Sequence, residues 1–225
     1  MKKYSIFLFC ILIVLLCNTF IGEEKDEKAI LHFWGRASVR IDLDDGRVIY
    51  IDPYAYYKGA YEKPADIILV THQHSDHNKI FLVKEKKSTR IFECPKNIKN
   101  GDVVFVDDIE IRAVQAYNSN HRKDQCCGFV IKVGELVIYH SGDTSTTSEM
   151  SEMSKYIIDY ALLCMDDYYN MGPKEAEKVT VLIKAKYVIP IHTSKSGYYD
   201  EKNVNKFNYS GKIKMKPGDS VKLYE

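Results

Sequence analysis

Residues 68–79, with the sequence ILVTHQHSDHNK, constrain the fold more than any other stretch of the chain. An apolar run of strand length ends at Val70 and leads directly into four potential metal ligands within six positions. These are His72, His74, Asp76 and His77. Imidazole and carboxylate groups suit Zn²⁺ and neighbouring first-row metals, and open α/β sheets place their sites at the carboxyl ends of strands. The stretch therefore predicts a metal site at the end of a buried strand.

Two later segments repeat this order of strand, turn and ligand. LVIYHSGDT delivers Asp143 after Gly142, and YVIPIHTSKSG delivers His192 after its apolar run. Each segment is weak evidence alone, because an aspartate after a glycine is an ordinary turn and a histidine after a strand is often merely exposed. Together with the cluster they add a second carboxylate and a fourth imidazole.

The rest of the chain alternates strand and helix patterns, which favours a layered α/β protein. Apolar or alternating runs predict strands, and capping signals with helical spacing predict helices. The expected strands are 38–43, 48–52, 66–70, 103–106, 109–116, a hairpin over 128–139, 156–164 and 186–191. The expected helices are 77–87, 146–156 with Thr146 and Glu149 as a capping box, and 173–186.

The first residues are typical of a secretory signal. Lys2 and Lys3 precede an apolar run over 6–16, which is shorter than the ~20 residues that a membrane-spanning helix needs. We expect residues 1–22 to be this signal, 23–28 a charged spacer and 29–225 a single domain. The protein would then be secreted, periplasmic or bound to the cell envelope. Cys17 is a candidate lipid-bearing cysteine, the only contact with a membrane that the sequence suggests.

Charge and cysteine content exclude some partners. Residues 1–22 contain two lysines and no acid, so 30 basic and 31 acidic side chains remain after them. This balance argues against a nucleic-acid surface. The four later cysteines do not have the spacing of a zinc ribbon or finger, although a disulfide is possible in an oxidising compartment. They are Cys94, Cys126, Cys127 and Cys164.

The ordered motifs resemble the metallo-β-lactamase superfamily of metal-dependent hydrolases. THQHSDH is followed by GDT about seventy residues later and by PIH about fifty further on. Upstream, VIYIDP looks like the strand of that superfamily that ends in an aspartate, here Asp52. HFWGRASVRI with YHSGDT is similar to the branch containing L-ascorbate-6-phosphate lactonase and N-acyl-phosphatidylethanolamine phospholipase D. The resemblance implies a four-layer αβ/βα sandwich with a metal site at one edge between two sheets.

The resemblance also implies two divalent metal ions, Zn²⁺ or otherwise Mn²⁺ or Fe²⁺. His72 and His74 would bind the first ion, and Asp143 would bridge both. The ligands of the second ion would be Asp76, His77 and His192. A metal-bound hydroxide would attack a carbonyl or phosphoryl centre, which makes the two ligating aspartates catalytic residues as well.

The sequence departs from this pattern at two positions. Where the family usually has a third histidine for the first ion, the matching position holds Asn118, and His121 follows three residues later. Three readings stay open: His121 replaces that ligand, Asn118 ligates through its amide oxygen, or the first site is partly vacant. Arg36 stands where this branch often has a histidine, and we interpret it as a surface cation at a strand end.

Residues near the expected metal edge are candidates for contacts with substrate. CMDDYYNMGP follows a buried strand, and its Asp166 and Asp167 are candidates to accept from metal-binding imidazoles or to protonate the leaving group. Asp167 is favoured as the functional, catalytic residue of the two. We expect Lys195 to stabilise an oxyanion or phosphate. Tyr168 and Tyr54 are expected to line the pocket.

Several functions remain compatible with such a site. The leading one is a zinc-dependent hydrolase acting on a small-molecule or lipid-like substrate. A phosphodiesterase or phospholipase is the alternative, because one metal site can attack carbon or phosphorus. A degenerate one-metal protein that only binds a ligand is a third reading. The sequence gives neither the substrate nor the oligomeric state.

Overall fold

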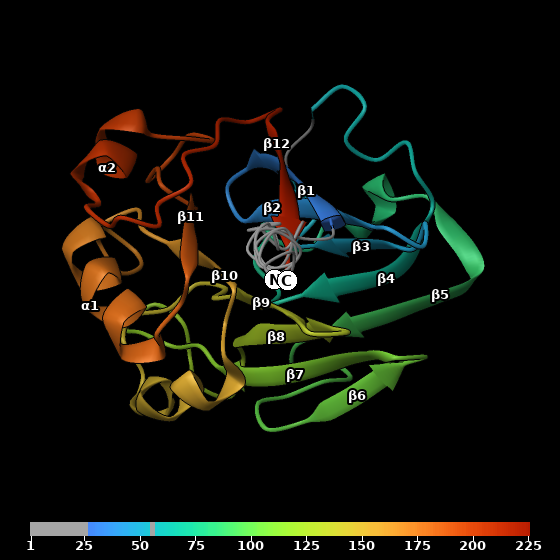
Figure 1. Ribbon diagram of the computed structural model, residues 1–225, viewed down its shortest axis with the longest axis horizontal. Coiled ribbons are helices and arrows are strands. Elements are labelled where there is room, and N and C mark those ends of the chain that lie inside the picture. The colour runs from blue at the N-terminus through green and yellow to red at the C-terminus, as the bar shows by residue number, and fades with distance from the viewer. Residues whose placement is uncertain (1–26, 55–56) are drawn as a thin grey trace, which may run out of the picture.

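The structure is a computed structural model that describes residues 27–54 and 57–225, so the expected signal over 1–22 lies outside the described residues. Two six-stranded mixed sheets pack face to face (Figure 1). The first has the order β12-β1-β2-β3-β4-β5, and the second has the order β11-β10-β9-β8-β7-β6. The strands of the first sheet are β1 Glu27–Gly35, β2 Ser38–Leu43, β3 Val48–Ile51, β4 Ala65–Val70, β5 Glu85–Glu93 and β12 Ser220–Tyr224. Those of the second are β6 Val103–Val106, β7 Ile109–Gln115, β8 Cys127–Val133, β9 Leu136–His140, β10 Tyr160–Cys164 and β11 Tyr187–Ile191.

The main core lies between the sheets, and β4 shows how the sequence builds it. Ile67 and Leu69 join the core shared with the second sheet, whereas Ile68 and Val70 pack on the opposite face of their own sheet. Side chains of a strand alternate between its two faces, so a continuous apolar run is buried on both sides. β4 is therefore fixed on both faces up to the point where the histidine cluster begins.

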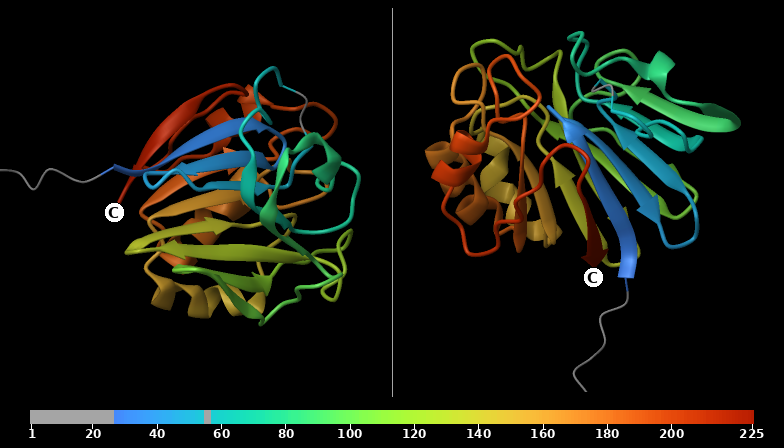
Figure 2. Two further views of the ribbon diagram at one scale, coloured as in Figure 1. Left: turned by 90° about the vertical axis from the view of Figure 1, so that its right-hand side faces the viewer. Right: turned by 90° about the horizontal axis from the view of Figure 1, so that it is seen from above.

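Helices cover mainly one side of the molecule. α1 (Pro173–Ile183), the 3₁₀ segment η2 (Ser148–Tyr156) and the short α2 (Glu201–Lys206) lie beside the second sheet (Figure 2, right). Met150 and Met153 of η2 and Val179 of α1 form the cluster on that face. On the outer face of the first sheet, the described residues form only loops and the 3₁₀ turn η1 (Ile80–Leu82). The expected αβ/βα sandwich is confirmed, with one thin outer layer.

Three expectations about local structure were wrong. The helix over 77–87 is absent, because η1 and the start of β5 occupy that range. Glu149 forms no capping box with Thr146: it accepts from the backbone of Gln115, and Thr147 is the N-cap of η2. The sequence also gave no signal for β12, and β1 begins at Glu27, within the range assigned to the charged spacer.

The topology brings several strand ends to one edge. β3, β4 and β5 run parallel in the first sheet, and β9, β10 and β11 run parallel in the second. Parallel strands end at the same edge of a sheet, so the residues after each of them gather there. No helix among the described residues is long and apolar enough to cross a membrane. The four cysteines after residue 27 are buried and free, so the possible disulfide is not formed.

Candidate metal centre

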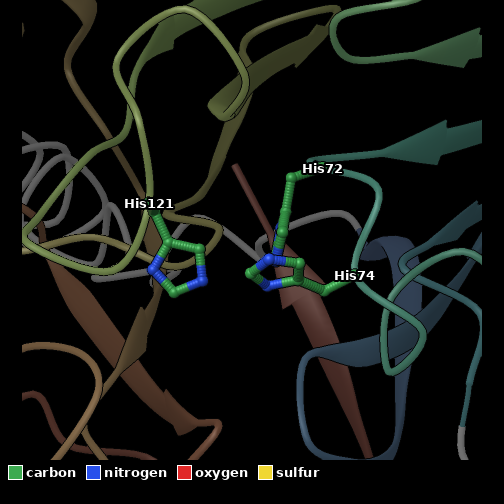
Figure 3. A group of neighbouring side chains, drawn as sticks. All are labelled: His72, His74 and His121. Carbon is green, nitrogen blue, oxygen red and sulfur yellow. The ribbon is translucent and has the colours of Figure 1, made fainter.

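Six of the expected ligands and His121 converge at this edge. The loop after β4 carries the cluster of three histidines and Asp76, while Asp143 follows β9 and His192 follows β11. His121 comes from the loop after β7, and its ring faces those of His72 and His74 (Figure 3). Three groups each bring their ligand atoms within 4.8 Å of one another: His72, His74 and His121; His72, His77 and Asp143; and Asp76, His77 and His192.

The spacing of these atoms fits ligands arranged around a shared ion. Oδ2 of Asp143 lies 3.5 Å from Nε2 of His77, 3.5 Å from Nε2 of His192 and 3.4 Å from Nε2 of His121. These separations are too long for good hydrogen bonds. Two ligands at tetrahedral angles around one Zn²⁺ lie about 3.4 Å apart, given Zn–N and Zn–O distances of about 2.1 Å. The atoms are therefore spaced for coordination, with Asp143 between the groups.

Unpartnered polar atoms point to the same conclusion. Nε2 of His72, Nε2 of His77 and Oδ1 of Asp143 are buried and have no hydrogen-bond partner among the described residues. A buried polar group without a partner costs free energy, so such atoms need an explanation. A bound cation would satisfy all three, and the donor set of imidazoles and carboxylates suits a first-row metal.

Carboxylates support the imidazoles of one group. Nδ1 of His77 lies 2.8 Å from Oδ2 of Asp52, and Nδ1 of His192 lies 3.1 Å from Oδ2 of Asp166. Asp52 also accepts hydrogen bonds from the backbone and hydroxyl of Thr71, both at 2.7 Å. A carboxylate on Nδ1 fixes the tautomer that leaves Nε2 free for a metal. We call Asp76, His77 and His192 the carboxylate-supported group.

Neutral side chains support two of the other imidazoles, those of His72 and His121. Nδ1 of His72 lies 3.1 Å from the hydroxyl of Thr71, and Nδ1 of His121 lies 2.9 Å from Oδ1 of Asn118. That amide oxygen also accepts from the backbone N–H groups of Asn120 and His121. The amide oxygen of Asn118 thus orients His121. The geometry therefore does not support Asn118 as a metal ligand. We call His72, His74 and His121 the neutral-supported group.

The pKa values follow this division. Burial alone would lower the pKa of His77 and His192, but the carboxylates of Asp143 and their own partners raise it, to about 9 for His192. Burial lowers the pKa of His72 and His121, because the pull of Asp143 is too weak to compensate. Burial opposes ionisation of Asp143, yet the neighbouring His192 and His77 hold its pKa well below the usual range. In the metal-free site, the protons therefore lie mainly on the imidazoles of the carboxylate-supported group.

The backbone at this edge is held in unusual conformations. Asp52 and His192 have φ angles of 48° and 43°, in a region that residues other than glycine seldom adopt. At Gly142, with φ of 59°, an added Cβ would lie 2.8 Å from the carbonyl oxygen of Cys127. Strained backbone conformations are common at functional sites. Here they turn the chain so that the ligands come directly after the strands.

The structure places some expected site residues elsewhere. Asp167 is exposed and lines a separate hollow with Pro173 and Lys206, so it does not face the ligands. Its neighbour Asp166 is the one that reaches His192, because the chain turns sharply at Asp167, with φ of 61°. The structure thus places Asp166, rather than Asp167, beside the ligands.

Two of the expected substrate contacts also lie outside the ligand cavities. Tyr168 stands under the ammonium of Lys195, which is 3.5 Å from its ring centroid. Tyr54 contacts Lys79 and Tyr198 instead. Two hollows are lined by ligands and formed by described residues; Tyr169 lines one of them, and neither Tyr168 nor Tyr54 lines either. Adjacent tyrosines in a loop point different ways, and the sequence gives no signal to separate them.

Two hollows open over the ligands. The first, of about 420 Å³, is lined by His72, His74 and His121 with Lys96 and Arg122. The second, of about 360 Å³, is lined by Asp76, Asp143 and His192 with Lys195 and Arg36. His74, Asn120 and His121 border both.

Arg36 is the functional candidate that the sequence analysis missed. It was interpreted as a surface cation, but its side chain is only 12% exposed and lies among the ligands. The turn between β1 and β2 carries it to the same edge. Its position in a GRAS turn after a strand was the available signal, and nothing in that signal gave its orientation.

Comparison with known proteins agrees with the fold. Residues 30–192 match the model of the beta-lactamase superfamily domain. A UPF0173 metal-dependent hydrolase from Caldivirga maquilingensis is 34% identical over 186 residues, which cover 72% of this chain and 81% of that protein.

Solved structures of the same fold include metal-dependent enzymes of two kinds. A putative metal-dependent hydrolase from Parabacteroides distasonis has a TM-score of 0.71 and 24% identity, covering 85% of this chain and 96% of that one. A diiron β-hydroxylase from Streptomyces venezuelae has a TM-score of 0.65 and 13% identity, covering 88% and 55%. These likenesses show the fold, whereas the family rests on the sequence matches. The chain therefore belongs to the β-lactamase superfamily, and within it to the metal-dependent hydrolases.

Proposed function

We propose that the protein holds two metal ions, with zinc as the expected metal, and hydrolyses a small-molecule or lipid-like substrate. The neutral-supported group would bind one ion, the carboxylate-supported group the other, and Asp143 would bind both. The observation that carries the proposal is the spacing of 3.4–3.5 Å between Oδ2 of Asp143 and three imidazole nitrogens. In this assignment His121, rather than Asn118, completes the first group.

Bound metals of this kind lower the pKa of water toward ~7 and polarise carbonyl or phosphoryl oxygens. The protein's part is to orient each ligand imidazole and to fix its tautomer, so that Nε2 faces the metal. Asp52 and Asp166 do this for His77 and His192, and Thr71 and Asn118 do it for His72 and His121. Aspartates 76 and 143 would then act through the metals, and Asp166 would act through His192.

The proposed site admits several classes of substrate. The site is compatible with esters and lactones, and equally with phosphodiesters, since the same ligands serve attack on carbon or phosphorus. Resemblance to the lactonase and phospholipase branch supports both possibilities. We also propose, from the N-terminal pattern alone, that the enzyme works outside the cytoplasm, either secreted or held at the cell envelope.

Metal content tests the proposal first. Protein purified without chelators should contain near two equivalents of metal per chain by elemental analysis, which also identifies zinc, manganese or iron. His121→Ala should reduce this to about one equivalent, because it removes a ligand from one group only. His32→Gln is the matched control, since His32 pairs with Asp42 away from the ligands.

Other outcomes would change the assignment. One equivalent in the wild type that survives His121→Ala would contradict the two-metal site and favour a one-metal protein. If Asn118→Ala removes a full equivalent while His121→Ala removes none, Asn118 is the ligand. A ligand that co-purifies stoichiometrically, with no turnover on esters, lactones or phosphodiesters, would favour a binding protein over a hydrolase.

A further inference from the structure

Arg36 sits at the carboxylate-supported group without a full partner. Its Nη1 atom donates to the carbonyl of Ser194 at 3.2 Å and lies 3.5 Å from Nε2 of His192. The nearest carboxylate oxygen is Oδ2 of Asp76, at 3.7 Å. Nε and Nη2 have no hydrogen-bond partner among the described residues.

A structural arginine in the same sheet looks different. Arg40 holds the carboxylate of Asp42 with two atoms, at 2.8 Å and 3.2 Å, and also donates to the carbonyl of Ala60. Contact through two nitrogen atoms is how arginine usually binds a carboxylate. Arg36 has that capacity but uses little of it within the protein.

The backbone holds Arg36 in place toward the second hollow. Its N–H donates to the carbonyl of Tyr198 at 2.8 Å, and its carbonyl accepts from the N–H of His192 at 2.7 Å. Its φ of 52° is one that residues other than glycine seldom adopt. The main chain of Arg36 is thus tied to the metal-ligand candidate His192, and the carbonyl of Ser194 holds Nη1 of its guanidinium.

A second cation lines the same hollow. The ammonium of Lys195 rests 3.5 Å above the ring of Tyr168, and no described acidic side chain forms an ion pair with it. The acids of the hollow are Asp76 and Asp143, which in the proposed function are neutralised by metal. Arg36 and Lys195 would then be left as excess positive charge at one end of the hollow.

We propose that Arg36 and Lys195 form an anion subsite, so that the enzyme prefers substrates with a phosphate or carboxylate group beside the bond that is cleaved. The inference rests on the proposed function, because it names the substrate class of the same site. Arg36 would grip the anion with its unused N–H groups, and Lys195 would close over it from the rim. A half-buried guanidinium with an exposed ammonium beside it gives specificity as well as affinity.

Inorganic phosphate is a suitable probe, titrated calorimetrically into metal-saturated protein. Arg36→Gln should weaken phosphate binding about tenfold, and Lys195→Met about threefold, because charged hydrogen bonds are stronger when buried. Arg36→Lys should restore part of the loss. Arg90→Gln and Lys87→Met, on the exposed edge strand β5, are the matched controls and should bind phosphate as the wild type does.

A pair of substrates gives an independent readout. A 4-nitrophenyl ester with a terminal carboxylate is compared with its uncharged, methyl-ended counterpart. Arg36→Gln should raise KM for the charged ester about tenfold more than it raises KM for the neutral ester.

Failure of this inference is separable from failure of the proposed function. Phosphate binding by Arg36→Gln equal to that of the wild type, with two metals retained, would overturn the anion subsite and leave the hydrolase assignment intact. A wild-type protein without metal would refute the two-metal function, whereas a phosphate affinity that still depended on Arg36 would support the subsite.

Discussion

The two ligand groups share Asp143 but differ in what stands behind their imidazoles. Carboxylates of Asp52 and Asp166 support His77 and His192, whereas a hydroxyl and an amide support His72 and His121. The imidazole pKa values diverge accordingly. Those of His77 and His192 are raised, and those of His72 and His121 are lowered. A carboxylate partner makes an imidazole a more basic ligand, so the groups should differ in metal affinity and in response to pH.

The shared carboxylate should give the largest effect. Asp143→Asn removes the charge that faces both groups, and we expect hydrolysis to fall by about a thousandfold, since metals contribute several kcal/mol to the transition state. Metal content should fall for both groups together. Loss of one equivalent only would mean that Asp143 binds a single ion. It would contradict the assignment of Asp143 to both groups.

Removing a carboxylate partner should come next. Asp166→Asn leaves Nδ1 of His192 without its charged acceptor, and partners of this kind are worth roughly 10–100-fold in metal affinity. The loss should appear in the carboxylate-supported group alone, measured by competition with a chelator. Asp167→Asn is the matched control, because Asp167 lines a separate hollow.

The neutral partner should matter less. Asn118→Ala removes the partner of Nδ1 of His121. We expect the metal affinity of the neutral-supported group to fall about tenfold, the lower end of the range for partners of metal-binding histidines. Asn118→Asp would place a carboxylate there instead and should raise both the affinity and the pKa of His121. If Asn118→Ala costs more than Asp166→Asn, the charge of the partner is not what distinguishes the groups.

The smallest effect is on the pH dependence of the metal-free protein. The folded-state pKa of His192 is about 9, above the ordinary 6.5, so its contribution to stability is complete below pH 6.5 and is lost as pH rises through 9. The lowered pKa values of His72 and His121 act in the opposite sense, because the folded state resists their protonation as pH falls below 6.5. The melting temperature of chelator-treated protein should therefore peak near neutral pH.

Variants can assign each side of that peak. Asp166→Asn should flatten the alkaline side, since it removes a charge that raises the pKa of His192. His121→Ala should flatten the acidic side. A melting temperature that rises steadily from neutral pH to about pH 9 in the metal-free wild type would contradict the protonated state assigned to the carboxylate-supported group.

Local patterns predicted the strands well where burial is strong. β4, β9, β10 and β11 are short apolar runs with a ligand or its neighbour directly after them, so sequence alone placed both the strand and the site. β5 failed because EKKSTRIFE is charged and mostly exposed. It lies at the edge of the sheet, where pairing with β4 outweighs a local preference for helix.

The sequence by itself determined the family, the sheet-rich α/β fold and the expected ligands, because each of those is written in a contiguous motif and its order along the chain. The tertiary structure alone decided which neighbour of each pair faces the site: Asp166 rather than Asp167, Tyr169 rather than Tyr168, and the imidazole of His121 with Asn118 behind it. It also turned Arg36 inward. The first three outcomes depend on loop backbone angles, and the position of Arg36 depends on His192 and Ser194, which are 156 and 158 residues away, so local patterns do not encode them.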